Sequence, residues 1–501
     1  MKKIIFFLTV SIVIFSSFKP KNQYGDVPQK IIVVGKIDNY DSNRQLTLSV
    51  NYIGFEQKEI FAKTDGAGNF IATFESYIPV DVWLRYKTNF LVLLHPGDSL
   101  FVQFDGRYNN RPQILETVVF GGNAAQTNQY AAKFQQMYFS NEIYNDWNKK
   151  NRAVKEYDAD RYIQYLDTIL QKSREIYDQF VAENQPNDES KKWAQLYIEG
   201  CYYDELGQYA RNHRRANNME NNNKWDVPKG FYDRLLNRLP IDTSMFICSH
   251  QISIFSDRFL STYFNDILNE KFKNLRITDI LSIRKKADEI RFSTISEFTL
   301  DPLLRQIMLT KMLSEELEEQ NINNYERFND LVNTYITEPF LKEPLHPMYL
   351  QTKARIKNPK IYTEAVLKEA ADFSIKQIVD NILQQNKGRV IYIDFWATWC
   401  GACLEEMPNS KTVELELKKK NVAFVYICLN SDEERWKSVL DKYQIGGQHY
   451  LLSGRQSGEI KSLFEINAVP DYMLIDKNGV IKEKGSHLRP LVAKEKIMEM
   501  L

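Results

Sequence analysis

The chain of 501 residues has little cysteine and no net charge. It contains five cysteines, and its 65 Lys and Arg residues equal its 65 Asp and Glu residues in number. Five cysteines in a chain of this length are too few for a fold held together by disulfides. Zero net charge supplies no overall field that would recruit nucleic acid, so no nucleic-acid partner is expected. The length favours several domains, each with its own core.

The apolar run at the start of the chain is too short to span a bilayer comfortably. Lys2 and Lys3 precede a mostly apolar run from Ile4 to Phe15, whereas a spanning helix needs about 20 residues. A charged start followed by a short apolar run predicts a secretory signal. Phe18 stands where a small residue would favour cleavage. Residues 1–18 are therefore predicted to be a signal peptide or an uncleaved N-terminal membrane anchor, and the protein is expected in the periplasm or cell envelope.

Residues 29–110 are rich in strand patterns. Leu46–Val50 alternates apolar and polar residues, and Phe70–Phe74 is a second strand candidate. Asp65–Asn69 and His95–Asp98 carry the Gly, Asp and Pro residues of turns. Short strands at this spacing predict a small antiparallel β-sandwich or barrel.

Residues 120–370 are predicted to form an α-helical region. Segments such as Asp160–Asn184 and Ser190–Arg211 space their apolar residues three and four apart. Cys201 and Cys248 lie in this region, and the sequence leaves open whether they pair. The region carries no chemical motif, and its role is not predicted. Prolines that are expected to separate its helices stand at Pro240, Pro302, Pro339 and Pro344.

One motif carries chemistry. Val390–Phe395 is a nearly continuous apolar run that predicts a buried central strand. It leads into Cys400-Gly401-Ala402-Cys403 and a helical stretch from Leu404. A cysteine at a helix start faces unpaired backbone N–H groups and the positive end of the helix dipole. These favour the thiolate of Cys400 and lower its pKa from ~8.5 toward neutrality. Cys403 follows one turn later, close enough to close a small disulfide ring.

A zinc site is the main alternative for a Cys-x-x-Cys motif. The chain has no second cysteine pair, and His449 and His487 lack the spacing of zinc ligands. The sequence therefore predicts a redox-active dithiol that needs no metal and no organic cofactor. Cys428 ends another apolar run and is interpreted as a buried core thiol.

The segment from Asp394 to Cys403, Asp-Phe-Trp-Ala-Thr-Trp-Cys-Gly-Ala-Cys, resembles the signature of the thioredoxin-like superfamily. Pro408 matches the proline of that family's active-site helix, and Val469-Pro470 matches its cis-proline. The extra segment before Pro470 is similar to the exported ResA/TlpA-like (AhpC/TSA-type) thiol–disulfide oxidoreductases. The resemblance covers residues 371–501 and implies an α/β thioredoxin-like fold with a mixed sheet.

The resemblance implies a catalytic role for four residues. Cys400 would attack the substrate disulfide, and Cys403 would resolve the mixed disulfide. Asp394 matches the buried aspartate of thioredoxins, and Glu406 matches the glutamate of the ResA/TlpA branch. Either carboxyl group, if desolvated, would have a raised pKa and would accept the proton of Cys403. The alternative for Glu406 is a solvated position on the helix face.

The residues that flank the dithiol are expected to contact the substrate. Ala402 replaces a proline that is common between the two cysteines, which changes the expected reduction potential. Asp471 follows the cis-proline where threonine is frequent, so the contacts near the cis-proline stay open. The predicted substrate-binding residues are Trp399, Gly401, Ala402, Val469 and Pro470.

The favoured interpretation is a thiol–disulfide oxidoreductase that reduces disulfides of exported proteins and draws electrons from a membrane donor. A disulfide oxidase or isomerase is an alternative. A cell-envelope protein that binds a partner or glycan and carries an accessory redox domain is another. A peroxiredoxin is disfavoured, because Ala397 stands where that family has a threonine.

Overall fold

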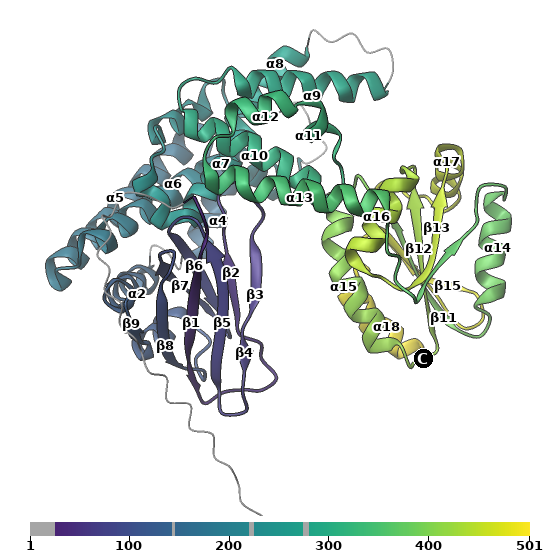
Figure 1. Ribbon diagram of the computed structural model, residues 1–501, viewed down its shortest axis with the longest axis horizontal. Coiled ribbons are helices and arrows are strands. Elements are labelled where there is room, and N and C mark those ends of the chain that lie inside the picture. The colour runs from purple at the N-terminus through teal and green to yellow at the C-terminus, as the bar shows by residue number, and fades with distance from the viewer. Residues whose placement is uncertain (1–25, 143–145, 220–224, 274–279) are drawn as a thin grey trace, which may run out of the picture.

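The computed structural model describes residues 26–142, 146–219, 225–273 and 280–501. The predicted signal peptide or anchor, residues 1–18, lies outside these residues. Figure 1 shows two N-terminal sheets with helices packed over one end, and a separate C-terminal α/β domain at their side. In the described part of the chain, no helix is long and apolar enough to cross a membrane.

The N-terminal strands form a five-stranded sheet of order β4-β5-β1-β8-β9 and a four-stranded sheet of order β3-β2-β6-β7. Val33 of the first sheet and Val82 of the second belong to the same buried cluster, so the two sheets enclose one core. Burial alternates along β5, as expected of a strand with one face in a core. The strands are β1 (Gln29–Asp38), β2 (Thr47–Val50), β3 (Lys58–Phe61), β4 (Lys63–Thr64), β5 (Asn69–Ser76), β6 (Val80–Arg85), β7 (Asn89–Leu94), β8 (Ser99–Asp105) and β9 (Val119–Gly122).

The prediction of an antiparallel N-terminal fold was wrong for the first sheet. β1 pairs with β5 antiparallel but with β8 parallel, so this sheet is mixed. Alternation of apolar and polar residues reports that a strand has one buried face, and it does not report the direction of the neighbouring strand. β9 belongs to this sheet although it lies in the segment after residue 110.

The predicted helical middle region is present. Its helices are joined to the second sheet by a buried carboxylate, because Asp81 of β6 accepts hydrogen bonds from Trp193 Nε1 over 3.1 Å and from the backbone N–H of His250 over 2.7 Å. The elements are α1 (Arg111–Thr117), α2 (Ala125–Ser140), α4 (Trp147–Glu156), α5 (Ala159–Asn184), α6 (Asp188–Ala216), η1 (Phe231–Arg238), η2 (Thr243–Cys248), α7 (Ser249–Phe259), η3 (Leu260–Phe264), α8 (Asn265–Phe272), α9 (Ile280–Ser296), α10 (Pro302–Glu318), α11 (Asn323–Arg327), α12 (Asn329–Tyr335) and α13 (Pro339–Lys357).

The prolines of this region do not all separate helices. Pro302 and Pro339 begin α10 and α13, where the missing N–H group has no helical partner to lose. Pro344 lies inside α13, so the prediction that it ends a helix was wrong. α13 packs against α10 and against α16, and this packing stabilises the helix despite the proline. Cys201 and Cys248 are free thiols.

The C-terminal domain has the predicted α/β fold with a mixed sheet. The strand order is β10-β13-β12-β11-β14-β15. The strands from β10 to β11 in this order are parallel, β14 runs antiparallel to β11, and β15 runs antiparallel to β14. β10 lies upstream of residue 371. The strands are β10 (Ala365–Lys368), β11 (Val390–Trp396), β12 (Val422–Leu429), β13 (Gly447–Leu452), β14 (Asp471–Ile475) and β15 (Ile481–Lys484). The helices are α14 (Ile375–Gln385), α15 (Gly401–Leu417), α16 (Glu433–Tyr443), α17 (Gly454–Leu463) and α18 (Pro490–Met500).

Helices cover both faces of this sheet. Tyr392 and Trp396 of β11 point into the cluster formed with α15, α16 and α18. Ile391 and Phe395 point into the opposite cluster, formed with α14 and α17. Every residue of β11 is buried, as the continuous apolar run predicted. The central strand therefore holds its carboxyl end, where the dithiol loop begins, in a fixed position.

Candidate active site

The dithiol lies at the start of the helix that follows the central strand. α15 begins at Gly401, before the predicted Leu404, and Cys400 is its N-cap residue. The backbone N–H of Cys403 donates a hydrogen bond to Cys400 Sγ over 3.2 Å. The two residues form a disulfide, and they are 7% and 2% exposed, respectively. Cys400 thus occupies the position in which backbone N–H groups and the helix dipole stabilise a negative sulfur.

Hydrogen bonds to the loop after β12 hold the dithiol loop in place. Trp399 Nε1 donates to the carbonyl oxygen of Asn430 over 3.0 Å, and Thr398 N–H donates to Ser431 Oγ over 3.1 Å. Trp399 remains 38% exposed beside the disulfide. Its indole is therefore fixed at one edge and available to a substrate at the other.

The predicted cis-proline is present. The peptide bond between Val469 and Pro470 is cis, and both residues are half-buried. Asp471 begins β14 and is the partner of Phe395 in the register between β14 and β11. Pro470 therefore precedes a strand that pairs with the carboxyl end of β11, from which the dithiol loop departs.

Asp394 is a buried acid in the central strand. The residue is 2% exposed, and its Oδ1 atom has no hydrogen-bond partner among the described residues. Burial raises the pKa of Asp394 well above its usual value of 3.8, and the nearby carboxylate of Glu406 raises it further. Asp394 is thus a group that holds a proton in the folded domain at a pH where a solvated aspartate has lost it.

Glu406 is not a solvated residue of the helix face. It is 8% exposed, and its Oε1 accepts a hydrogen bond from Arg489 Nη1 over 2.7 Å. Its Oε2 accepts one from Asn409 Nδ2 over 2.9 Å. Arg489, the N-cap residue of α18, was missed by the sequence analysis, because 83 residues separate it from Glu406 and no local pattern marks the pair.

The helical region also reaches the dithiol helix, which the sequence analysis did not predict. Arg435 of α16 binds Glu319 at the end of α10 through an ion pair of 3.0 Å. A Cβ atom placed on Gly401 would lie 3.6 Å from Glu319 Oε1. A carboxylate from outside the C-terminal domain therefore lies beside Gly401, one of the two residues between the cysteines.

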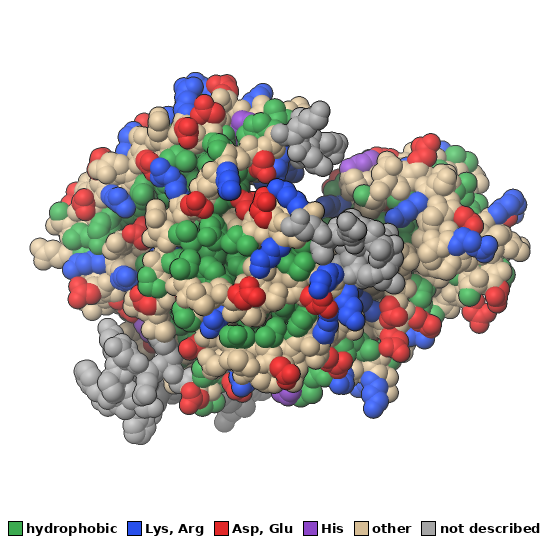
Figure 2. Space-filling view, turned by 90° about the horizontal axis from the view of Figure 1, so that it is seen from above, with side chains coloured by type: hydrophobic (Ala, Val, Ile, Leu, Met, Phe, Trp, Pro, Cys, Tyr) green, Lys and Arg blue, Asp and Glu red, His purple; other side chains and the backbone are tan. Residues whose placement is uncertain are grey.

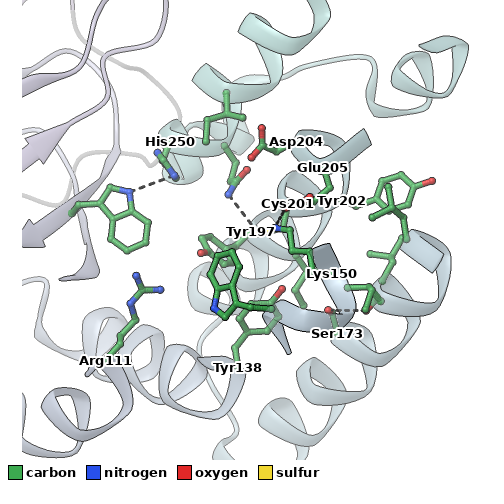
Figure 3. A pocket seen from close by; sticks show the side chains of 18 of the residues that line it. Arg111, Tyr138, Lys150, Ser173, Tyr197, Cys201, Tyr202, Asp204, Glu205 and His250 are labelled. Atoms are coloured by element: carbon green, nitrogen blue, oxygen red, sulfur yellow. Dashed lines mark hydrogen bonds and ion pairs between the residues drawn. The ribbon is translucent and has the colours of Figure 1, made fainter. Parts of the chain in front are cut away.

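A second candidate site lies between the four-stranded N-terminal sheet and the helices. Figure 3 shows this cavity, of about 400 Å³, with Arg111, Lys150 and His250 around its space. The guanidinium group of Arg111 stacks on the ring of Trp83, 5.0 Å from its centroid. Trp147, which also lines the cavity, is 60% exposed. Aromatic side chains with a few charged groups are the usual lining of ligand sites.

The mixed sheet and the disulfide-forming Cys-x-x-Cys at the start of the helix after its central strand define a thioredoxin-like domain with a redox dithiol. Residues 375–497 match the family model described as Redoxin. ResA, a thiol-disulfide oxidoreductase of Oceanobacillus iheyensis, is 32% identical over 120 residues, which are 23% of this chain and 61% of the relative. The thioredoxin-like protein YneN of Bacillus subtilis is 28% identical over 131 residues, or 25% of this chain and 74% of the relative.

Among solved structures, the thioredoxin domain of a thiol-disulfide oxidoreductase from Bacteroides vulgatus is 21% identical, with a TM-score of 0.22 over 23% of this chain and 84% of that one. The chain spans less than two thirds of the length of ResA from Oceanobacillus iheyensis. In this segment the C-terminal domain is similar to the ResA/TlpA-like thioredoxin-fold proteins.

Proposed function

We propose that the protein is a thiol–disulfide oxidoreductase that reduces disulfides of exported proteins. The observation that carries this proposal is the position of Cys400, whose sulfur accepts the N–H of Cys403 at the start of α15 while it forms a disulfide with that residue. A reduced Cys400 in this position is stabilised as the nucleophilic thiolate. The resemblance to ResA and YneN in the same segment supports the proposal.

The proposed reaction transfers two electrons. The thiolate of Cys400 attacks one sulfur of the substrate disulfide, that S–S bond breaks, and the other substrate sulfur leaves as a thiolate. Cys403 then loses its proton and attacks the sulfur of Cys400, which releases the second substrate thiolate and leaves the Cys400–Cys403 disulfide. The substrate is reduced and the domain is oxidised. A thiol-reducing donor at the membrane would restore the dithiol.

Asp394 is the proposed proton acceptor for Cys403, because it is buried and carries a raised pKa. Glu406 is proposed to act through Asp394, since its charge raises the pKa of that residue while Arg489 fixes its carboxylate. Trp399, Gly401, Ala402, Val469 and Pro470 are the proposed substrate contacts. Of these residues, Trp399, Gly401 and Ala402 are exposed around the disulfide.

Export is part of the proposal. The charged start of the chain and the short apolar run after it support a periplasmic or cell-envelope location. Attachment through an uncleaved N-terminal segment is the proposed alternative to a released protein.

Reduction of insulin disulfides tests the proposal. Purified protein with a chemical dithiol as electron source is expected to precipitate insulin chains faster than the dithiol alone. Cys400→Ser should abolish this acceleration. Cys428→Ser, which removes a fully buried thiol of the same domain, is the matched control and should retain it. Equal rates with wild-type protein and Cys400→Ser would contradict the proposal.

The cavity of Figure 3 favours a second candidate function, in which the part of the chain before the C-terminal domain binds a small partner segment or a glycan. In this view the two N-terminal sheets form a β-sandwich that supplies Trp83 to the site. Titration of the tryptophan fluorescence with oligosaccharides and peptides would test it. Saturable quenching that is lost in Trp147→Ala would support binding, and no change in either protein would exclude it for the ligands used.

A further inference from the structure

The end of α10 docks against α16 through three polar contacts in a row. Arg435 Nε donates to the backbone carbonyl of Glu319 over 2.9 Å, and its Nη2 donates to Glu319 Oε2 over 3.0 Å. Ser438 Oγ donates to Gln320 Oε1 over 2.8 Å, and Lys442 Nζ forms an ion pair of 2.5 Å with Glu318. Figure 1 shows α13 reaching α16 at the junction between the helices and the C-terminal domain. The helical region is thus held at one edge of the thioredoxin-like domain.

This contact fixes the orientation of Glu319. Arg435 binds both the backbone carbonyl and one carboxylate oxygen of Glu319, so the residue is held at two points, one of them on its side chain. The other oxygen, Oε1, faces Gly401, because a Cβ atom built there would lie 3.6 Å from it. The side chain of Glu319 is 37% exposed. A molecule that contacts the exposed surface between the two cysteines therefore also meets this carboxylate.

Other acids surround the same edge. Glu405 is exposed on α15, two residues after Cys403. Glu56, which follows β2 in the N-terminal part, lies close enough to both Glu318 and Glu405 for their charges to act on it. Burial raises the pKa of Glu319, whereas Arg435 lowers it. The guanidinium group of Arg435 is engaged by Glu319, so it does not offer an open positive site to a substrate.

We propose that Glu319 is a specificity-determining residue that the helical region contributes to the dithiol site, where it selects disulfides flanked by Lys or Arg over disulfides flanked by Asp or Glu. This inference rests on the proposed oxidoreductase function and gives it a substrate class. A single carboxylate at this range changes encounter and binding several-fold at low salt, roughly threefold to tenfold. The selectivity falls at high salt, because exposed charges are screened.

Two synthetic peptides test the proposal. Each has one internal disulfide, and they differ only in carrying two Lys or two Glu residues beside the cysteines. The full chain, reduced beforehand and freed of reductant, is mixed with each peptide, and the single-turnover rate of peptide reduction is followed by mass spectrometry. The protein dithiol is the only electron source, and it ends as the Cys400–Cys403 disulfide.

Three variants separate charge from structure. Glu319→Gln removes the charge, and Glu319→Asp keeps it. Glu318→Gln is the matched control, since Glu318 also pairs with α16 and its side chain is 34% exposed. The wild-type protein should reduce the Lys peptide several times faster than the Glu peptide at low salt. Glu319→Gln should lower this ratio about threefold or more, whereas Glu319→Asp and Glu318→Gln should retain it.

The possible failures are distinguishable. If neither peptide is reduced by the wild-type protein, the proposed oxidoreductase function is wrong. If both peptides are reduced at one rate, or if Glu318→Gln lowers the ratio as much as Glu319→Gln, the function stands and the assignment of Glu319 is overturned.

Discussion

Arg489 Nη1 lies 2.7 Å from Glu406 Oε1 and so joins the last helix of the chain to the dithiol helix. The side chain of Glu406 is 10% exposed, and that of Arg489 is 51% exposed. A nearly buried carboxylate is stable only with a charged or hydrogen-bonded partner. Arg489 therefore holds a negative charge beside Asp394, and this charge is the second cause of the raised pKa of Asp394.

Arg489→Gln should lower the stability of the protein by about 1–2 kcal/mol, because the carboxylate of Glu406 would lose its charged partner. The loss is limited to this range because the Arg489 side chain is half exposed to water, which weakens the ion pair. The matched control is Lys494→Gln, which breaks the more exposed ion pair between Lys494 and Glu416 on the same two helices. That change should cost no more than about 0.5 kcal/mol. Urea denaturation of the two variants measures the difference. Equal losses of stability would show that the Arg489–Glu406 pair contributes no more than the exposed pair between Lys494 and Glu416.

Asp394→Asn should change how stability depends on pH. In the unfolded chain the carboxyl group of Asp394 titrates near pH 3.8, whereas in the folded domain it keeps its proton to a much higher pH. Above 3.8 the folded state therefore binds more protons, so the free energy of unfolding falls as the pH rises, until the folded pKa is passed. Each unit by which the pKa is raised contributes about 1.4 kcal/mol to this fall.

The variant has no titrating group at residue 394, so its free energy of unfolding should lose this decline above about pH 4. Urea denaturation at several pH values measures it. Glu406→Gln serves as the comparison, because it leaves Asp394 in place and should keep most of the decline. An unchanged slope in Asp394→Asn would show that Asp394 is ionised in the folded domain.

The C-terminal domain should need β10. A fragment that starts at Asn358 includes this strand, which pairs with β13 from Ala365 to Lys368. A fragment that starts at Phe373 also loses the buried Ala370, whose carbonyl accepts a hydrogen bond from Gln456. With a net value of about 1 kcal/mol for each lost hydrogen bond, the shorter fragment should be less stable by roughly 2 kcal/mol or more. Equal urea midpoints for the two fragments would contradict this boundary.

The reduction potential should be intermediate. The residues between the cysteines are Gly401 and Ala402, without the histidine of strong oxidases or the proline of strong reductants. We expect a potential on the order of −250 to −180 mV, within the range of thioredoxin-like proteins. Equilibration of the full chain with glutathione buffers measures it. A potential near −120 mV, as in strong oxidases, would favour the oxidase alternative.

The sequence was a good guide to local structure around the dithiol. The apolar run at Val390–Phe395 became a fully buried strand, and the cis-proline before residue 471 was predicted from its motif. These signals are local, since one strand, one turn or one helix start decides them. The strand patterns of residues 29–110 could not report the parallel pairing of β1 with β8, because alternation is the same in both directions.

Contacts between distant segments could not be predicted. Glu406 and Arg489 are 83 residues apart, and Glu319 and Arg435 are 116 residues apart. A charged side chain on a helix is usually solvated, so nothing in the local pattern separates these residues from other Glu and Arg residues of the chain. The fold alone brings them together, and with them a carboxylate of the helical region to the dithiol helix.

Covalent trapping tests the central claim most directly. Cys403→Ser, reduced and then mixed with a disulfide-bonded peptide, should accumulate a mixed disulfide, because Cys400 attacks and no second thiol of the site resolves the adduct. Mass spectrometry of the digested adduct should place the peptide on Cys400, and a reductant should release it. Cys400→Ser should form little adduct, since Cys403 is more deeply buried. Faster trapping through Cys403 in Cys400→Ser, or no adduct with either variant, would contradict the account.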